Sequence, residues 1–289
     1  MTSSAFDYAR PDGVGGAVRM LAGNDGTTRV LAGGQSLLPM LRLRRISPRL
    51  VVDVGRVPEL RGVTEETGSL LIGTMTTHHE VLHDPLIRRY APLLSQATAT
   101  VGDPAVRHRG TLGGAIAHAD PAGDMPVTVL ALDGELVAEG PRGRRSIPAA
   151  EFFTGCLSSA LELDELLVGI RLPKRHDDWA YHYEKFRPSA QAPTTVAVAV
   201  AVRCDAGHIA EAGIGLANVA ATPVRASATE AALAGAVVST ESVARAAAAA
   251  AENVSPLSAT SAPADYLAHL TRVLTHRAVL IAARPIPRR

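Results

Sequence analysis

The stretch LAGGQSLLPML, Leu31 to Leu41, places two glycines between an apolar run and a leucine-rich segment. The apolar run Thr28 to Leu31 is typical of a strand, and Ser36 is a plausible N-cap for a helix that carries the leucines behind it. A second strand follows at Val51 to Val54 and ends at Gly55. This part of the chain is therefore predicted to be a strand, a glycine turn, a helix and a strand.

The glycine pair Gly33-Gly34 has a counterpart at Gly113-Gly114, in the stretch RGTLGGAIAHADPAGD. A glycine pair can adopt positive φ, so its N–H groups turn toward one point and a ligand approaches without meeting a Cβ atom. A helix that begins at Ser36 adds unpaired N–H groups and its positive dipole end. A lone pair of glycines is more often only a turn. Two pairs favour one shared anionic ligand, and a diphosphate fits, although neither pair matches the P-loop or the G-x-G-x-x-G pattern.

Length and composition exclude several classes of protein. The 289 residues are enough for about two domains, and 47% of them are hydrophobic. Lys and Arg total 29 against 28 Asp and Glu, so no basic field attracts nucleic acid. We expect a cytoplasmic protein, because the N-terminus lacks the pattern of a secretory signal and no apolar run approaches about 20 residues. Only Cys156 and Cys204 are present, so any iron-sulfur cluster must belong to another chain.

The remaining pattern predicts two further regions. Two short strands surround a Thr-Gly turn after Gly62, helices begin near Thr77 and Leu93, and a long irregular segment follows up to residue 126. Beyond a charged boundary at Pro173 to Asp178, TTVAVAVAVRC alternates valine and alanine like a strand and leads through a turn into another strand. The other predicted elements are the helices 13–22, 125–132, 227–234, 240–253 and 264–284 and the strands 135–139 and 166–172.

A zinc-protease site is one alternative that the sequence raises. The text HEVLH, His79 to His83, matches the H-E-x-x-H pattern on a helix, but no third ligand is evident downstream. A surface helix is the simpler interpretation.

Four other polar or sulfur-bearing residues each leave two interpretations open. Arg107 and Arg109, beside the second glycine pair, could bind phosphate or fix the loop by bonding carbonyls. Asp120 could cap the helix that starts at Met125 or hold a turn, and the turn is the favoured interpretation. Cys156 follows two phenylalanines and is interpreted as buried filler rather than a nucleophile.

These residues resemble a known family. LAGGQSLLPMLRLR (31–44) together with RHRGTLGGAIAHADPAGDMP (107–126), and also FDYARP (6–11), YEKFR (183–187) and ATPVRA (221–226), is similar to the FAD-binding medium subunit of molybdenum hydroxylases, the carbon monoxide and xanthine dehydrogenase family. The resemblance implies an α+β fold. A two-subdomain FAD-binding domain of the PCMH and vanillyl-alcohol-oxidase type would occupy residues 1–175, divided into 1–56 and 57–175. Residues 178–289 would form a domain with a three-stranded antiparallel sheet and a helical bundle.

The resemblance also implies which residues contact FAD. Backbone groups of the first glycine loop would grip the diphosphate, the second pair would form the opposite wall, Asp124 would bond the ribityl or neighbouring hydroxyls, and Lys185 would lie near a ring edge. The implied set is Ala32, Gly33, Gly34, Gln35, Ser36, Leu37, Thr111, Leu112, Gly113, Gly114, Asp124, Leu166, Leu167 and Lys185.

The resemblance implies a role in electron transfer. FAD would be bound non-covalently and would pass electrons from the [2Fe-2S] clusters of a small partner subunit to an external acceptor, while a large subunit carries the molybdopterin. A dimer of heterotrimers is the implied assembly, and no catalytic residue or metal site is expected on this chain. Two departures from the family pattern, Ala115 and the segment Gln191-Ala192-Pro193, raise the alternative of a scaffold or other nucleotide-binding protein that has lost FAD. A stand-alone flavin oxidase is a third possibility.

Overall fold

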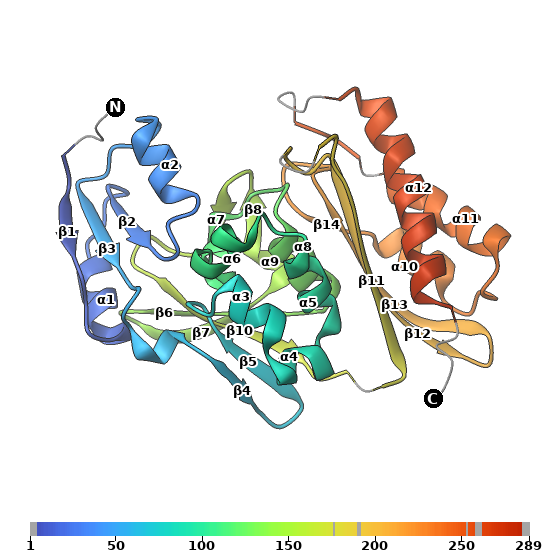
Figure 1. The fold of residues 1–289 in the computed structure, drawn as a ribbon, viewed down its shortest axis with the longest axis horizontal. Coiled ribbons are helices and arrows are strands. Elements are labelled where there is room, and N and C mark those ends of the chain that lie inside the picture. Colours follow the sequence, from blue (N-terminus) through green and yellow to red (C-terminus); the bar gives the residue numbers. More distant parts are fainter. Residues whose placement is uncertain (1–4, 176, 190–191, 253, 258–261, 285–289) are drawn as a thin grey trace.

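The computed structural model describes residues 5–175, 177–189, 192–252, 254–257 and 262–284. Three parts follow one another along the long axis of the molecule, from the blue N-terminal part through the green centre to the orange C-terminal part (Figure 1). Each part contains a β-sheet and helices. The predicted mixture of helices and strands is confirmed.

The first part is a three-stranded parallel sheet with the order β1-β3-β2, built from β1 (Asp7–Ala9), β2 (Thr28–Leu31) and β3 (Leu50–Asp53). Helix α1 (Val14–Leu21) turns Val14, Ala17, Val18 and Leu21 inward, and these pack with Val52 and Val54. Helix α2 (Leu37–Arg42) follows the first glycine pair. Ser36 occupies the predicted N-cap position, but its side chain makes no capping bond.

The central part is a five-stranded antiparallel sheet with the order β4-β5-β10-β6-β7. Strand β10 (Leu166–Pro173) is buried on both faces, because α1 covers one side and the central helices cover the other. Its remaining elements are β4 (Val63–Glu65), β5 (Ser69–Gly73), β6 (Glu135–Gly140), β7 (Gly143–Pro148), β8 (Phe153–Gly155), β9 (Ser158–Ser159), η1 (Pro58–Leu60), α3 (His78–His83), α4 (Pro85–Tyr90), α5 (Pro92–Ala99), α6 (Pro104–Arg109), α7 (Leu112–His118), α8 (Asp124–Ala131) and α9 (Ala149–Phe152).

The segment predicted to be irregular contains two helices, α6 and α7, so that prediction was wrong. Asp103 caps α6, because its Oδ1 accepts from the Val106 backbone N at 2.9 Å, and Pro104 occupies the first helical position. Thr111 caps α7 by accepting from the Gly114 backbone N at 3.2 Å. The low helix propensity of glycine hid α7 in the sequence, and tertiary packing outweighs it.

The C-terminal part has four antiparallel strands in the order β11-β12-β13-β14, one more than the three expected. The fourth strand, β14 (Val224–Arg225), pairs with the end of β13 and is too short to stand out in the sequence. The alanine run leaves the α-helix at Ala248 and continues as a 3₁₀ turn. The other elements are β11 (Trp179–Phe186), β12 (Val196–Asp205), β13 (His208–Ala217), α10 (Ser227–Leu233), α11 (Thr240–Ala248), η2 (Ala249–Ala251) and α12 (Ala264–Ala282).

Alternation of valine and alanine along β12 assigns its two faces to different neighbours. The valines, such as Val198, pack in one core with α10, α11 and α12, whereas the alanines, such as Ala199, pack in the core of the central part. Glycines on β13 complete the small-residue face: a Cβ atom at Gly213 would lie 2.3 Å from the Ala131 carbonyl oxygen, and one at Gly215 would lie 2.5 Å from the Val127 carbonyl oxygen. Helix α8 therefore rests directly on the C-terminal sheet.

Candidate functional site

A cavity of about 720 Å³ lies between the first and central parts of the molecule. Residues of both glycine loops line it, together with the N-terminal end of α8 and the β8–β9 hairpin. Its volume falls in the range that ligand pockets usually have. This is the candidate site.

The two glycine pairs meet at this cavity. A Cβ atom at Gly114 would lie 3.3 Å from the Ala32 Cβ, and one at Gly33 would lie 2.1 Å from the Arg109 carbonyl oxygen and 2.8 Å from the Gly110 Cα. Real Cβ atoms do not approach other atoms within 2.1 Å, so only glycine at position 33 lets the loops touch. The predicted convergence of the two pairs is confirmed.

The backbone amides of the two loops differ in what they bond. Within the described ranges, no group accepts a hydrogen bond from the backbone N–H of residues 33–36, and Gly34 has φ +76°. In the second loop, Leu112 N donates to Thr76 O at 2.9 Å, Gly113 N to Thr74 O at 2.9 Å and Gly114 N to Thr111 Oγ1. The expectation that both pairs present unpaired amides is therefore wrong: the first loop supplies donors, and the second supplies a close wall.

Most of the predicted cofactor-binding residues line this cavity. Leu112 is an exception, because its side chain is fully buried in the hydrophobic core of the central part and does not reach the cavity. Lys185 does not line it either, but reaches a residue that does. The predicted residues that line the cavity are Ala32, Gly33, Gly34, Gln35, Ser36, Leu37, Thr111, Gly113, Gly114, Asp124, Leu166 and Leu167.

Asp124 connects the cavity to the C-terminal part. Its Oδ1 accepts a hydrogen bond of 2.5 Å from the Tyr183 hydroxyl, and its Oδ2 accepts one of 2.8 Å from Lys185 Nζ. All three side chains are at least nine-tenths buried. Burial and the neighbouring carboxylate raise the pKa of Tyr183 well above its usual value of 10, so the hydroxyl keeps its proton and donates. This ion pair fixes a charged group at the cavity wall.

The HEVLH segment forms α3, but its glutamate is used for capping. Glu80 Oε2 accepts from the Thr77 backbone N at 2.7 Å and from Thr77 Oγ1 at 2.8 Å. His83 Nδ1 lies 2.7 Å from the His79 carbonyl oxygen, and the His79 ring stacks on His108. Among the described residues, no three His, Cys, Asp or Glu side chains are placed to hold a metal ion. The segment acts as a capped surface helix.

Of the residues with open interpretations, Arg107 bonds backbone carbonyls, with Nη1 3.0 Å from Val101 O and 3.4 Å from Gly102 O. Asp120 holds a turn, accepting from Ala122 N at 2.9 Å, and also lines the cavity. Cys156 is exposed, so the expectation of a buried side chain was wrong. Ala115 lines the cavity, and Gln191 lies outside the described residues.

Sequence reasoning missed several residues of the cavity, among them His78 at the start of α3 and Ser158 and Leu163 around the β8–β9 hairpin. The hairpin carries no glycine pair or charge pattern that points to a ligand. For His78 a signal was present, since it follows the Thr77 cap directly, but the H-E-x-x-H pattern drew attention to the next two histidines.

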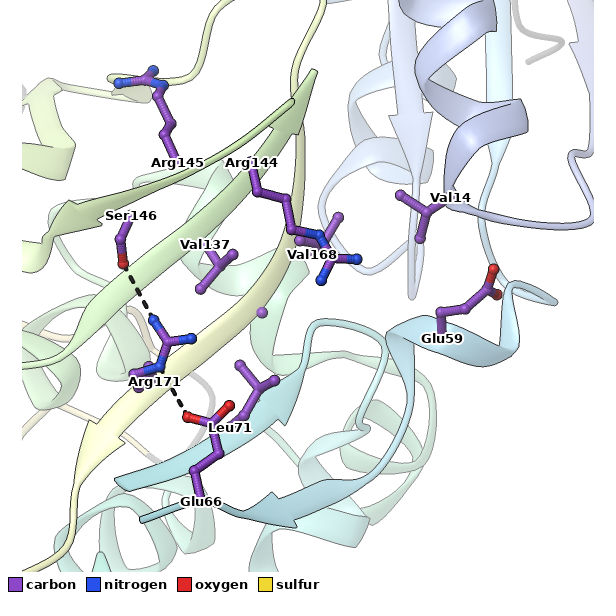
Figure 2. A pocket seen from close by; sticks show the side chains of 11 residues that line it. Val14, Glu59, Glu66, Leu71, Val137, Arg144, Arg145, Ser146, Val168 and Arg171 are labelled. Atoms are coloured by element: carbon purple, nitrogen blue, oxygen red, sulfur yellow. Dashed lines mark hydrogen bonds and ion pairs between the residues drawn. The ribbon is translucent and has the colours of Figure 1, made fainter. Parts of the chain in front are cut away.

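Figure 2 shows a smaller cavity, of about 320 Å³, on the side of the five-stranded sheet that faces α1. The three arginines that line it, and Glu66, already have partners inside the protein. Arg171 Nε donates to Glu66 Oε2 at 3.0 Å and its Nη1 lies 3.4 Å from Ser146 Oγ (Figure 2). Arg144 similarly pairs with Glu139. With these charges compensated, this cavity offers a ligand less than the larger one.

Comparisons with known proteins agree with this architecture. The family described as the FAD binding domain in molybdopterin dehydrogenase matches residues 4–175, and the family described as the CO dehydrogenase flavoprotein C-terminal domain matches residues 181–282. The carbon monoxide dehydrogenase medium chain of Hydrogenophaga pseudoflava is 37% identical over 96% of this chain and 97% of its own length.

Solved structures share the whole fold. A chain of carbon monoxide dehydrogenase from Hydrogenophaga pseudoflava superposes with a TM-score of 0.95 at 39% identity, covering 98% of both chains. A chain of quinoline 2-oxidoreductase from Pseudomonas putida 86 gives 0.92 at 32% identity, covering 98% of this chain and 99% of the other. None of the helices in the described ranges could span a bilayer. The resemblance drawn from the sequence is confirmed: the chain belongs to the FAD-binding medium subunits of molybdopterin dehydrogenases of the carbon monoxide dehydrogenase type, and is an oxidoreductase component.

Proposed function

We propose that this chain binds FAD non-covalently in the 720 Å³ cavity and passes electrons from the [2Fe-2S] clusters of a partner subunit to an external acceptor. The observation that carries the proposal is the loop 33–36, whose backbone N–H groups have no acceptor among the described residues and line the cavity. Such a run of donors beside a glycine with positive φ suits anionic oxygens. A diphosphate is the part of FAD that carries them.

The residues around this loop have separate roles in the proposal. Backbone N–H groups of residues 33–36 would hold the diphosphate, and the Thr111–Gly114 wall would exclude water from its other side. Leu37, Leu166 and Leu167 would supply apolar contact. Asp124, held by Tyr183 and Lys185, would accept hydrogen bonds from ribityl hydroxyls. The bound flavin supplies reversible one- and two-electron redox chemistry, which the side chains of this protein cannot.

The electron source must lie on other chains. With two cysteines in 289 residues, this chain cannot hold the four thiolates that an iron-sulfur cluster needs. We propose a large molybdopterin-binding subunit, a small iron-sulfur subunit, and a dimer of heterotrimers located in the cytoplasm. Residues 1–175, as subdomains 1–56 and 57–175, would bind the flavin, and residues 178–289 would form the second domain. Relatives named for carbon monoxide and for quinoline share this fold, so substrate choice belongs to another polypeptide.

Reconstitution tests the proposal. The full chain, purified and freed of any ligand, is expected to quench flavin fluorescence on titration with FAD and to show the flavin absorption bands after gel filtration. Native purification is expected to recover a molybdopterin-containing chain and a cysteine-rich chain. A chain that binds no FAD under any condition would support the alternative of a scaffold. A native purification that recovers the FAD-loaded chain with neither partner chain would support a stand-alone flavin oxidase.

A further inference from the structure

His78 is a buried histidine at the edge of the cavity. It is the first residue of α3, its side chain is only 4% exposed, and it lines the cavity beside Gly110. Its backbone N donates to the Gly110 carbonyl oxygen at 2.9 Å. A Cβ atom at Gly110 would lie 2.9 Å from His78 Cδ2 and 3.3 Å from Nε2, so the ring presses directly on the glycine backbone. The ring position is therefore well defined by packing.

No residue in the described part of the chain bonds a ring nitrogen of His78. Nδ1 is sealed from solvent and makes no hydrogen bond, and none of the described residues bonds Nε2. Burial lowers the pKa of His78 to about 4, and the nearby Arg107 acts in the same direction, so the ring is neutral at physiological pH. Buried polar atoms normally find partners, and each exception calls for an explanation. His83, on the same helix, has one, because its Nδ1 meets the His79 carbonyl oxygen.

The position of His78 suggests which ligand group completes it. Gly110 separates the ring from the first glycine loop, since a Cβ atom at Gly33 would lie 2.8 Å from the Gly110 Cα. The ring and the unpaired amides of residues 33–36 thus both approach Gly110 and line the same cavity. A neutral imidazole has one N–H and one lone pair. Because protein atoms seal Nδ1 from the cavity, Nε2 is the nitrogen that can meet a ligand. When the proton is on Nε2, this nitrogen can donate a hydrogen bond, and the lone pair of Nδ1 has no partner.

We propose that His78 is a phosphate-binding residue, a neutral imidazole whose Nε2–H donates to an oxygen of the dinucleotide's diphosphate. This assignment rests on the proposed function. It adds a side-chain donor to the backbone donors of the first glycine loop.

NMR of the full chain labelled with ¹⁵N-histidine tests the assignment without any substitution. The ligand-free spectrum is expected to show His78 with its proton on Nε2, and comparison with H78Q assigns the signal. Titration with ADP, which carries the diphosphate, is expected to shift the His78 Nε2 resonance, whereas riboflavin, which has no phosphate, leaves it in place. A shift with riboflavin alone, or with neither ligand while FAD binds, overturns the proposal.

Two substitutions separate the N–H from the shape of the ring. H78Q keeps an amide N–H close to the position of Nε2, and its FAD dissociation constant is expected to stay within about threefold of the wild type. H78L removes the donor and is expected to weaken FAD binding by about tenfold or more, the usual effect of losing a hydrogen bond to a charged group. H83L, the same change at an exposed histidine of α3, is the matched control and leaves binding unchanged.

The outcomes separate this inference from the proposed function. If wild-type protein binds no FAD, the proposed function fails. If wild-type and H78L proteins bind FAD equally, only the role of His78 fails. Should H78L not fold, H78Q and the ADP titration of the wild type still decide. Ligand-free H78L is expected to unfold at the same or a higher urea concentration than the wild type, because it removes an unpaired buried nitrogen.

Discussion

The ion pair between Asp124 and Lys185 allows a quantitative test of how the central and C-terminal parts are joined. Asp124 starts α8 and Lys185 lies on β11, and both side chains are about nine-tenths buried, with 2.8 Å between Oδ2 and Nζ. Substitution D124A leaves the Lys185 ammonium in a buried position with no anion. Breaking one side of a buried pair in this way costs about 3–5 kcal/mol of unfolding free energy.

A double-mutant cycle isolates the pair. K185M removes the charge from the other side, and the double variant D124A/K185M leaves no buried charge. Because an apolar replacement of a buried ion pair is often close to neutral, the double variant is expected to be more stable than D124A alone. Y183F is the control, because it removes one hydrogen bond to Asp124 but keeps the ion pair. It is expected to lower the unfolding free energy by about 1 kcal/mol.

Urea unfolding of the ligand-free full chain at pH 7, followed by far-UV circular dichroism, measures each free energy. We expect a coupling of at least about 1 kcal/mol between the two positions. If the two single changes add to the double change within about 0.5 kcal/mol, the ion pair contributes nothing specific and the reasoning is refuted. FAD titration of the double variant then reports on Asp124 at the cavity separately from its effect on stability.

Two further predictions concern the cavity wall. G33A places a Cβ atom 2.1 Å from the Arg109 carbonyl oxygen, so it is expected to lower the unfolding free energy by about 1–3 kcal/mol and to weaken FAD binding, whereas G15A, in an open helical position, is neutral or slightly stabilising. The pKa of His78 is about 4 when folded and 6.5 when unfolded, so the unfolded chain takes up the proton first as pH falls and stability drops below about pH 6.5. Protonation of His78 in the unfolded chain is therefore expected to lower the unfolding free energy by about 2 kcal/mol between about pH 7.5 and pH 5. Urea unfolding should show this loss in the wild type and not in H78L.

Local patterns in the sequence predicted the elements that depend on neighbouring residues. The strand before Gly33, the valine strand β3 and the Val-Ala strand β12 all appear where alternation or apolar runs place them. Helices α6 and α7 were missed because their signals are single capping residues, Asp103 and Thr111, inside a stretch rich in glycine and proline. Capping signals are weaker than periodicity, and packing against distant strands adds the stability that short helices lack.

Within the candidate site, the sequence indicated which residues could contact a ligand. The contacts in the structure show which of their atoms are free to do so. The second glycine pair looks like the first in the sequence, yet its amides bond Thr74 and Thr111, while a Cβ atom at Gly113 would lie 2.2 Å from the Thr74 Cβ. Its glycines are required for packing. Leu112 is one residue from the cavity wall and points into the core. Such differences arise from partners far along the chain.

The sequence by itself determined the class of protein: the motifs around the two glycine loops resemble those of a flavin-binding subunit, and with only two cysteines the iron-sulfur clusters must belong to another chain. Only the tertiary structure decided which loop presents unpaired amides, that Asp124 is held by Tyr183 and Lys185, and that the His78 ring has no hydrogen-bond partner among the described residues. The reason is physical. Residue type sets the chemistry that a side chain or amide can offer, whereas hydrogen bonds between segments distant in the chain decide whether that chemistry is already used.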